Sequence, residues 1–254
     1  MQEQWNVRVL LLEGPTDISF FVPILKRMYG FQEAPKELYG KIKIGKNYPN
    51  GNRDSLSKPV CIVKNGRVVV LFHVGGRDKL PKALRGVLTT LDAYWDEDFR
   101  PRIVGVVRDI DTEHNVFNWV KSVLRSLNFE ENGEGILLVG GIRVVPFGLG
   151  NVGVDNPNIE EKRELELLLT ALVEKAGTLS EFERSLEQLK EDAQRKLKPK
   201  DVMHVLAIAK DYDGDAMSGL YRKFIEELIR AKPELIEELL EESGLRGFLD
   251  KMVG

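Results

Sequence analysis

Three carboxylates stand where apolar runs of the sequence end. Glu13 follows the run at residues 7–12. Asp109 and Asp111 follow the run at residues 103–107, and alternate residues of an extended segment project to the same side. Clustered carboxylates repel one another unless a cation lies between them, and Mg²⁺ or Mn²⁺ binds such oxygen ligands at about 2.1 Å. If the two runs are neighbouring strands of a parallel sheet, their ends share one edge, and the pattern predicts a divalent-metal site there.

Other side chains are weaker candidates for the same metal site. Glu13 taken alone is equally well explained as a cap of the following turn. A second metal ion would need further carboxylates, and the candidates are Glu160 and Glu164, at the start of an expected helix, and Asp201. Solvated helix positions explain these three equally well. His73 lies in a predicted strand that ends in two glycines, although a packed or surface histidine is the default interpretation.

An alternation of strands and helices in residues 1–155 must position these groups. Buried apolar runs predict the strands, and apolar residues at helical spacing predict the helices. The alternation implies an α/β fold with a mainly parallel sheet flanked by helices. The expected elements are a strand at 7–12, a helix from 16 or 17 to about 30, a hairpin at 59–74 with an Asn65-Gly66 turn, a helix from 79 or 81 to about 94, a strand at 103–107, a helix at 115–127 and a strand pair within 135–148.

The sequence changes character near residue 155. Residues 1–155 are expected to form the α/β domain, with an insertion at about 31–70 that includes a long loop and the hairpin. Residues 156–254 are predicted to be almost entirely helical, with the first helix beginning near residue 159. We therefore expect an all-α C-terminal extension after the sheet.

Composition predicts a soluble globular protein. Charged residues make up 30% of the 254 residues, and no apolar run approaches the length needed to cross a bilayer. The sequence shows no signal-peptide pattern, so we expect a cytoplasmic protein with no membrane contact. The single cysteine, Cys61, excludes an intramolecular disulfide and a cysteine-based zinc site.

Positive charge is concentrated in one part of the chain. Residues 1–155 carry 21 Lys and Arg against 18 Asp and Glu, whereas residues 156–254 carry 16 against 22. Within residues 41–85 there are 11 basic residues and two acidic ones. This excess suits a phosphate backbone, and the alternative is the solvated surface of a charge-rich, heat-adapted protein. The predicted phosphate contacts are Lys41, Lys43, Lys46, Arg77, Lys79 and, beside Asp109, Arg108.

Three motifs in order carry a resemblance to a known family. LLLEGPTD, then a strand ending in Gly75-Gly76, then VVRDIDT resemble the Toprim domain of primases, topoisomerases, recombination proteins, ribosomal-RNA maturases and nucleases of the overcoming-lysogenization-defect class. The resemblance covers roughly residues 5–130. Among Toprim proteins, the sequence most resembles the maturases, those nucleases and small archaeal proteins with a single Toprim core.

The resemblance implies roles for individual residues. Glu13 would be the general acid/base or a metal ligand, and Asp109 and Asp111 would be metal ligands. Asp17 would position the first helix or reach the metal through water. Backbone turns would be formed by Gly14, Gly75 and Gly76.

The implied activity is Mg²⁺- or Mn²⁺-dependent hydrolysis of phosphodiester bonds in nucleic acid, as in a nuclease. The rival interpretation is a non-catalytic module that binds nucleic acid or protein, with a structural ion or none at the carboxylates. Primase and topoisomerase activities are not expected, because the sequence has no ATPase, zinc-binding or strand-passage module. The sequence does not decide between DNA and RNA, or whether the chain acts as a homodimer or with a protein partner.

Overall fold

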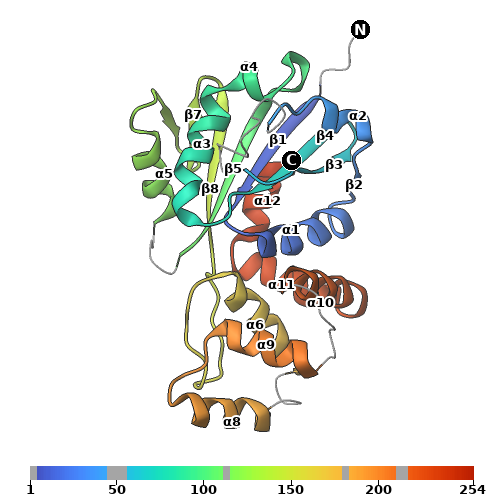
Figure 1. Ribbon diagram of the computed structural model, residues 1–254, viewed down its shortest axis with the longest axis vertical. Helices are drawn as coiled ribbons and strands as arrows, with labels where there is room; N and C mark the ends of the chain where they lie inside the picture. Colours follow the sequence, from blue (N-terminus) through green and yellow to red (C-terminus); the bar gives the residue numbers. More distant parts are fainter. Residues whose placement is uncertain (1–4, 45–55, 111–114, 179–182, 210–216) are drawn as a thin grey trace. The chain divides into compact units, whose positions relative to one another are not determined.

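The computed structural model describes residues 5–44, 56–110, 115–178, 183–209 and 217–254. These residues contain one eight-stranded sheet flanked by helices and a helical segment towards the C-terminal end of the sequence, so the predicted α/β class is confirmed (Figure 1). The strands are β1 (Asn6–Leu12), β2 (Gln32–Glu33), β3 (Val60–Lys64), β4 (Arg67–His73), β5 (Pro101–Asp109), β6 (Glu130–Asn132), β7 (Ile136–Val139) and β8 (Ile142–Leu149). The helices are α1 (Pro15–Arg27), α2 (Lys36–Gly40), α3 (Leu80–Thr89), α4 (Leu91–Tyr94), α5 (Val116–Leu124), α6 (Leu165–Lys175), α8 (Glu183–Ala193), α9 (Pro199–Ala209), α10 (Met217–Ala231), α11 (Pro233–Glu242) and α12 (Leu245–Val253), with short 3₁₀ helices at Arg77–Lys79 and Glu97–Phe99.

The centre of the sheet consists of three parallel strands in the order β4-β1-β5. Leu12 of β1 lies opposite His73 of β4, and Leu11 lies opposite Val106 of β5. Six of the seven residues of β1 are buried, as expected of an apolar strand that is covered on both faces. Because the three strands run in the same direction, their carboxyl ends lie at the same edge of the sheet, as the sequence pattern predicted.

Antiparallel pairs lie towards both edges of the sheet, so the sheet is mixed. β3 pairs with β4 through the predicted hairpin, in which Asn65 (φ 47°) and Gly66 (φ 73°) both have positive φ, as a type I′ turn requires. On the other side β7 pairs with both β8 and β6. β6 was not predicted, because its three residues, Glu-Glu-Asn, are polar and exposed.

Helices cover both faces of the sheet. Figure 1 shows α3 and α5 on one face, and the last turns of α12 lie on the opposite face. There a Cβ added at Gly105 of β5 would lie 2.8 Å from the Met252 Sδ, so glycine allows α12 to approach closely. The rings of Phe147 and Phe248 stack with centroids 4.8 Å apart. Residues 248–254 therefore complete the core of the sheet.

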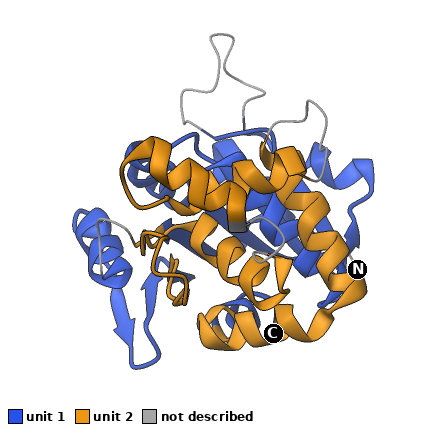
Figure 2. Ribbon diagram, turned by 90° about the horizontal axis from the view of Figure 1, so that it is seen from below, with its two compact units in different colours: residues 1–108, 115–147, 248–254 blue, residues 109–114, 148–247 orange. Residues whose placement is uncertain are grey.

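The chain divides into two compact units, which Figure 2 shows in different colours. The first contains residues 1–108, 115–147 and 248–254, and the second contains residues 109–114 and 148–247. The second unit is built around α6, where residues 165–173 are all buried, as in a helix that is enclosed on every side. Helices α9 and α11 pack against it. Among the described residues, no helix combines the length and the apolar character needed to cross a membrane.

The first helix of the second unit begins later than predicted. It was expected near residue 159 but begins at Leu165, so that prediction is wrong by about six residues. Ile159 forms a parallel bridge with Leu197, and the Glu160 amide donates a hydrogen bond of 2.7 Å to the Leu197 carbonyl. This pairing between distant segments keeps the preceding residues extended and overrides the local helical pattern.

Candidate functional site

Glu13 follows β1 at the edge where the central strands end. Its carbonyl accepts a hydrogen bond of 2.9 Å from the Gly76 amide, and the Leu12 carbonyl accepts one of 2.9 Å from the Val74 amide. The chain leaves β4 through Gly75 (φ 72°) and Gly76 (φ 123°), backbone conformations that favour glycine. The predicted glycine turn therefore lies beside the predicted catalytic carboxylate and is hydrogen-bonded to its backbone.

Asp17 holds the turn that connects Glu13 to α1. Its Oδ2 accepts a hydrogen bond of 2.9 Å from the Gly14 amide, and the residue is 5% exposed. Gly14 is the N-cap of α1, so a carboxylate in the first helical turn satisfies the cap amide and also interacts favourably with the helix dipole. This geometry supports the first of the two roles considered for Asp17, positioning of the helix.

Arg108 provides a positive charge beside Glu13. Its Nε lies 3.7 Å from the Glu13 Oε1, and the two side chains are 11% and 17% exposed. The guanidinium carbon also lies 4.4 Å from the centroid of the Trp119 ring, within the range of a cation–π interaction. At 3.7 Å the ion pair is too long for a hydrogen bond, so charge and stacking hold the guanidinium in place. Trp119 was not predicted, because no local pattern links a residue of α5 to the end of β5.

Asp109 is the last residue of β5 and belongs to the second unit, like the candidates Glu160 and Glu164. Its Oδ1 accepts a hydrogen bond of 3.1 Å from the amide of Leu165, the first residue of α6. Glu164, which is 7% exposed, forms an ion pair with Lys162, whereas Glu160 is exposed. Asp111 lies outside the described residues.

Asp201 has a structural explanation in the second unit. Its Oδ2 accepts hydrogen bonds of 2.8 Å from the Arg195 guanidinium and from the Lys198 amide, at the start of α9. Burial alone would raise the pKa of Asp201, but these hydrogen bonds and the nearby positive charges outweigh burial and lower it. Asp201 is therefore engaged in a helix cap and an ion pair.

The predicted phosphate contacts of the basic segment differ in their surroundings. Lys41 forms an ion pair with Asp98, and the Lys43 Nζ lies 2.8 Å from the Asp96 Oδ1. The acidic partners follow residue 85, so the local charge excess counted in the sequence is partly neutralised in three dimensions. Arg77 and Lys79 lie exposed beyond the glycine turn, with the Arg77 Nε 3.9 Å from the Asp78 carboxylate. Lys46 lies outside the described residues.

The side chains of His73 and Cys61 differ in their reactivity. Burial raises the pKa of Cys61 to about 12, so its thiol stays protonated and unreactive at neutral pH. Burial also lowers the pKa of His73, which favours the neutral imidazole. The His73 amide donates a hydrogen bond of 2.9 Å to Ser57 Oγ, while its buried Nδ1 has no hydrogen-bond partner among the described residues.

The donor types fit a hard divalent cation. Mg²⁺ commonly takes one or two carboxylates and completes its shell with water and phosphate oxygens, and Glu13 is a carboxylate of this kind. Within the described part of the chain, however, no three His, Cys, Asp or Glu side chains form a group that could hold a metal ion. In addition, the guanidinium of Arg108 stands beside Glu13, the carboxylate that would bind the cation.

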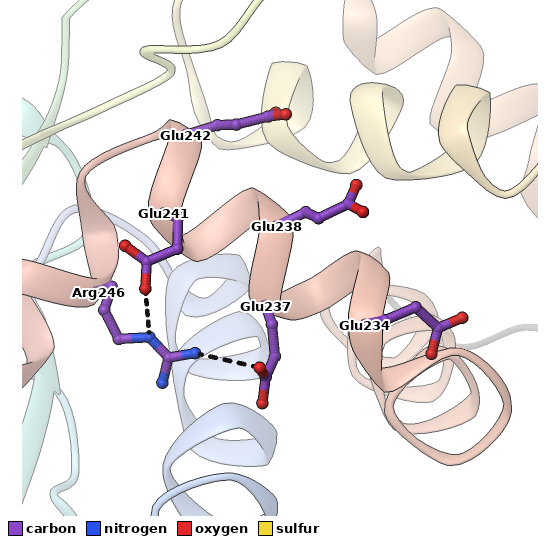
Figure 3. Close-up of a pocket in the computed structure, with 6 residues that line it drawn as sticks. All are labelled: Glu234, Glu237, Glu238, Glu241, Glu242 and Arg246. Atoms are coloured by element: carbon purple, nitrogen blue, oxygen red, sulfur yellow. Dashed lines mark hydrogen bonds and ion pairs between the residues drawn. The ribbon is translucent and has the colours of Figure 1, made fainter.

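An acidic surface in the second unit is a different kind of cluster. Five glutamates of α11 and Arg246 line a hollow of about 440 Å³ (Figure 3). Figure 3 shows Glu237 and Glu241 directed towards Arg246, at 3.8 and 3.2 Å. On the other side of the helix, Lys175 contacts Glu242 at 2.7 Å and Glu238 at 3.4 Å. On this exposed helix face, two cations offset part of the negative charge of the five glutamates.

Comparison with known proteins identifies the family. A family model described as "Protein of unknown function (DUF3226)" matches residues 7–241. The chain belongs to this family. An "Uncharacterized protein MJECL12" of Methanocaldococcus jannaschii is 42% identical over 232 residues, which are 89% of this chain and 92% of that protein. The crystal structure of the hypothetical protein PH0156 from Pyrococcus horikoshii OT3 matches with a TM-score of 0.84 and 35% identity, covering 98% of this chain and 100% of that one.

Proposed function

We propose that this DUF3226 chain is a Toprim-like enzyme that hydrolyses phosphodiester bonds of nucleic acid with Mg²⁺ or Mn²⁺. The observation that carries the proposal is the edge formed by β4, β1 and β5. Glu13 follows the central strand, the Gly75-Gly76 turn follows its neighbour, and Asp109 ends the strand on the other side. These elements have the order and the strand-end positions that the Toprim resemblance requires.

The proposed roles follow from the chemistry of each side chain. Glu13 acts as the general acid/base or as a metal ligand, and Asp109 and Asp111 are metal ligands. A bound divalent cation supplies charge neutralisation at the phosphate and an activated water. Asp17 keeps Glu13 in place through the Gly14 amide, and Arg108 supplies a fixed positive charge beside Glu13.

The basic residues at this edge support nucleic acid as the substrate. Arg77 and Lys79 are exposed directly after the glycine turn, where a phosphate backbone can reach them. Lys41 and Lys43 are already paired with Asp98 and Asp96, so we expect them to contribute less to binding. The expected salt dependence of binding therefore rests mainly on the residues that follow β4.

The test is cleavage of end-labelled DNA and RNA, single- and double-stranded, in Mg²⁺, in Mn²⁺ and in EDTA. Glu13→Gln keeps the size of the side chain and removes its charge, and we expect it to reduce cleavage at least about 100-fold. Glu37→Gln is the matched control, because Glu37 is an exposed residue of α2. Cleavage that survives in Glu13→Gln at the wild-type rate would show that the catalytic assignment is wrong.

One observation favours a second candidate function. The guanidinium of Arg108 beside Glu13 can neutralise this carboxylate without a metal ion, as a non-catalytic binding module would require. Thermal unfolding separates the two functions. A metal-binding enzyme gains melting temperature in Mg²⁺, and Asp109→Asn loses that gain. Salt-sensitive nucleic-acid binding without cleavage and without a Mg²⁺-dependent shift would favour the binding module.

A further inference from the structure

Three arginines of the first unit gather where α12 ends against the sheet. Arg8 lies near the start of β1, and Arg67 and Arg143 lie at the starts of β4 and β8. The Arg8 Nη2 donates a hydrogen bond of 2.8 Å to the Gly254 carbonyl, and the Arg67 Nη1 donates one of 3.1 Å to the Val253 carbonyl. Burial lowers the pKa of Arg8, and the positive charges of Arg67 and Arg143 lower it further, so both are close enough to repel the Arg8 guanidinium.

The register of β8 places Arg143 on the same face of the sheet as Arg8. Alternate residues of a strand share a face, and Phe147, which follows Arg143 on that alternation, stacks on Phe248 of α12 with ring centroids 4.8 Å apart. Arg8 lies on this face as well, because its hydrogen bond reaches the residue that follows α12. The three guanidinium groups therefore surround the same end of α12.

This arginine cluster lacks a negative partner in the part of the chain that the structure describes. Arg8 is 3% exposed, yet its Nε and Nη1 have no hydrogen-bond partner among those residues. None of the three arginines forms an ion pair with a described Asp or Glu, and Arg143 forms no hydrogen bond with a described residue. Deeply buried charges are almost always paired, because only an opposite charge and hydrogen bonds repay the loss of hydration. The two carbonyls carry partial charges, so most of the positive charge is unbalanced.

We propose that Arg8, Arg67 and Arg143 form an oxyanion site beside the end of α12, and that its ligand is a phosphate group. Arg67 and Arg143 are only partly buried, so an anion can reach them, while the buried Arg8 adds its charge from beneath. Planar guanidinium groups match the oxygens of a phosphate in pairs, which makes arginine the preferred ligand for this group. Packing of residues 248–254 keeps the cluster together without a ligand, and a bound anion removes the remaining repulsion. The site is independent of the proposed function, because Glu13 follows the opposite end of β1.

The first measurement is thermal unfolding in a titration of inorganic phosphate at constant pH and ionic strength. Above its Kd, each ten-fold increase in phosphate should raise the melting temperature of the wild type by about 3 °C. Arg143→Gln should lose this shift, and it should fold normally because Arg143 has no hydrogen bond to a described residue. Arg102→Gln is the matched control, because Arg102 is an exposed arginine of β5. Arg108→Gln should also keep the shift, which separates this site from the edge that carries Glu13. Equal shifts in the wild type and Arg143→Gln would overturn the site.

The second measurement locates the bound phosphate on the folded wild-type chain. Phenylglyoxal modifies accessible guanidinium groups, and mass spectrometry of peptides gives the rate at each arginine. Phosphate should slow the modification of Arg143 and leave that of the exposed Arg102 unchanged. Modification of Arg143 at the same rate with and without phosphate would contradict binding at this site.

A third measurement distinguishes two sources of the oxyanion. A carboxylate at residue 254 would offer oxygens similar to those of a phosphate, and a Gly-Ser-Gly-Ser tail added after Gly254 moves such a carboxylate away from the arginines. We expect the phosphate-dependent shift in melting temperature to be the same with and without the tail. A shift that is present only with the tail would show that a carboxylate of the chain itself fills the site, and would overturn the assignment of phosphate as its ligand.

Discussion

Two arginines at opposite ends of the central strands are held in different ways. Arg8 of β1 is 3% exposed, and its Nη2 donates a hydrogen bond of 2.8 Å to the Gly254 carbonyl. Its neighbour Arg67 donates one of 3.1 Å to the Val253 carbonyl, so both bind carbonyls at the carboxyl end of α12, where a cation is favourable. Arg108, at the other end, faces Glu13 without a hydrogen bond. A hydrogen bond to the end of the chain thus fixes Arg8, whereas charge and stacking on Trp119 hold Arg108.

The buried position of Arg8 has an energetic cost. Burial lowers its pKa, and the positive charges of Arg67 and Arg143 lower it further. Two of its nitrogens, Nε and Nη1, have no hydrogen-bond partner among the described residues. The carbonyl of Gly254 offsets part of this cost, and the rest must be supplied by the packing of residues 248–254 on the sheet.

The largest effect should come from Arg8→Ala. It removes the hydrogen bond to the Gly254 carbonyl and leaves a cavity beneath α12, so we expect the free energy of unfolding to fall by about 3 kcal/mol. Arg8→Met fills much of the same space without a buried charge and should cost less than half of that. Urea unfolding monitored by circular dichroism measures both. The comparison fails if Arg8→Ala is no more destabilising than Arg108→Ala.

A smaller effect is expected from Asp17→Ala. The Gly14 amide loses its acceptor at the start of α1, and loss of a cap of this kind costs about 1.5 kcal/mol. Asp17→Asn keeps an acceptor and should recover most of the stability. Asp78→Ala provides the control, because the Asp78 side chain is 98% exposed. Asp17 and Asp78 with equal effects would argue against the positioning role.

Arg108→Ala should be milder, and its effect should depend on Mg²⁺. In EDTA we expect a loss of about 1 kcal/mol, because Glu13 loses a counter-charge but remains partly exposed. Mg²⁺ should restore that loss by binding the carboxylate. The stability lost in Arg8→Ala should not be restored by Mg²⁺. The melting temperatures of the two variants, each measured with and without Mg²⁺, therefore sharpen the comparison. A loss in Arg108→Ala that is the same in both buffers would contradict it.

The smallest effect concerns the dependence of stability on pH. Burial lowers the pKa of folded His73 below its unfolded value of about 6.5, so the unfolded state binds the proton first as the pH falls. The contribution of His73 is present above about pH 6.5 and is lost as the pH falls towards the folded pKa. Urea midpoints between pH 5 and 7.5 should be flatter in His73→Gln than in the wild type. His204→Gln is the control, since His204 is exposed.

The sequence predicts those parts of the fold that depend on local pattern. The buried runs of β1, β4 and β5 and the Asn65-Gly66 turn follow from apolar periodicity and turn chemistry, and the structure contains them. Because strand direction places their ends at one edge, the position of Glu13 beside the glycine turn could also be predicted.

The remaining features depend on contacts between distant residues. The late start of α6 follows from the pairing of Ile159 with Leu197, which no local window contains. The ion pair of Lys43 with Asp96 joins residues far apart in the chain, so counting charges in one segment overestimated its free positive charge. The stacking of Arg108 on Trp119 likewise requires α5 to pack beside the end of β5.

The hydrogen bond between Asp109 and the first amide of α6 gives the protein a natural spectroscopic probe. The Leu165 amide is protected from exchange with deuterium for as long as the Asp109 carboxylate accepts its proton. A ligand that draws this carboxylate away would speed the exchange of that amide while leaving the interior of the helix protected. One resolved signal in a nuclear magnetic resonance spectrum would therefore report directly on the state of Asp109.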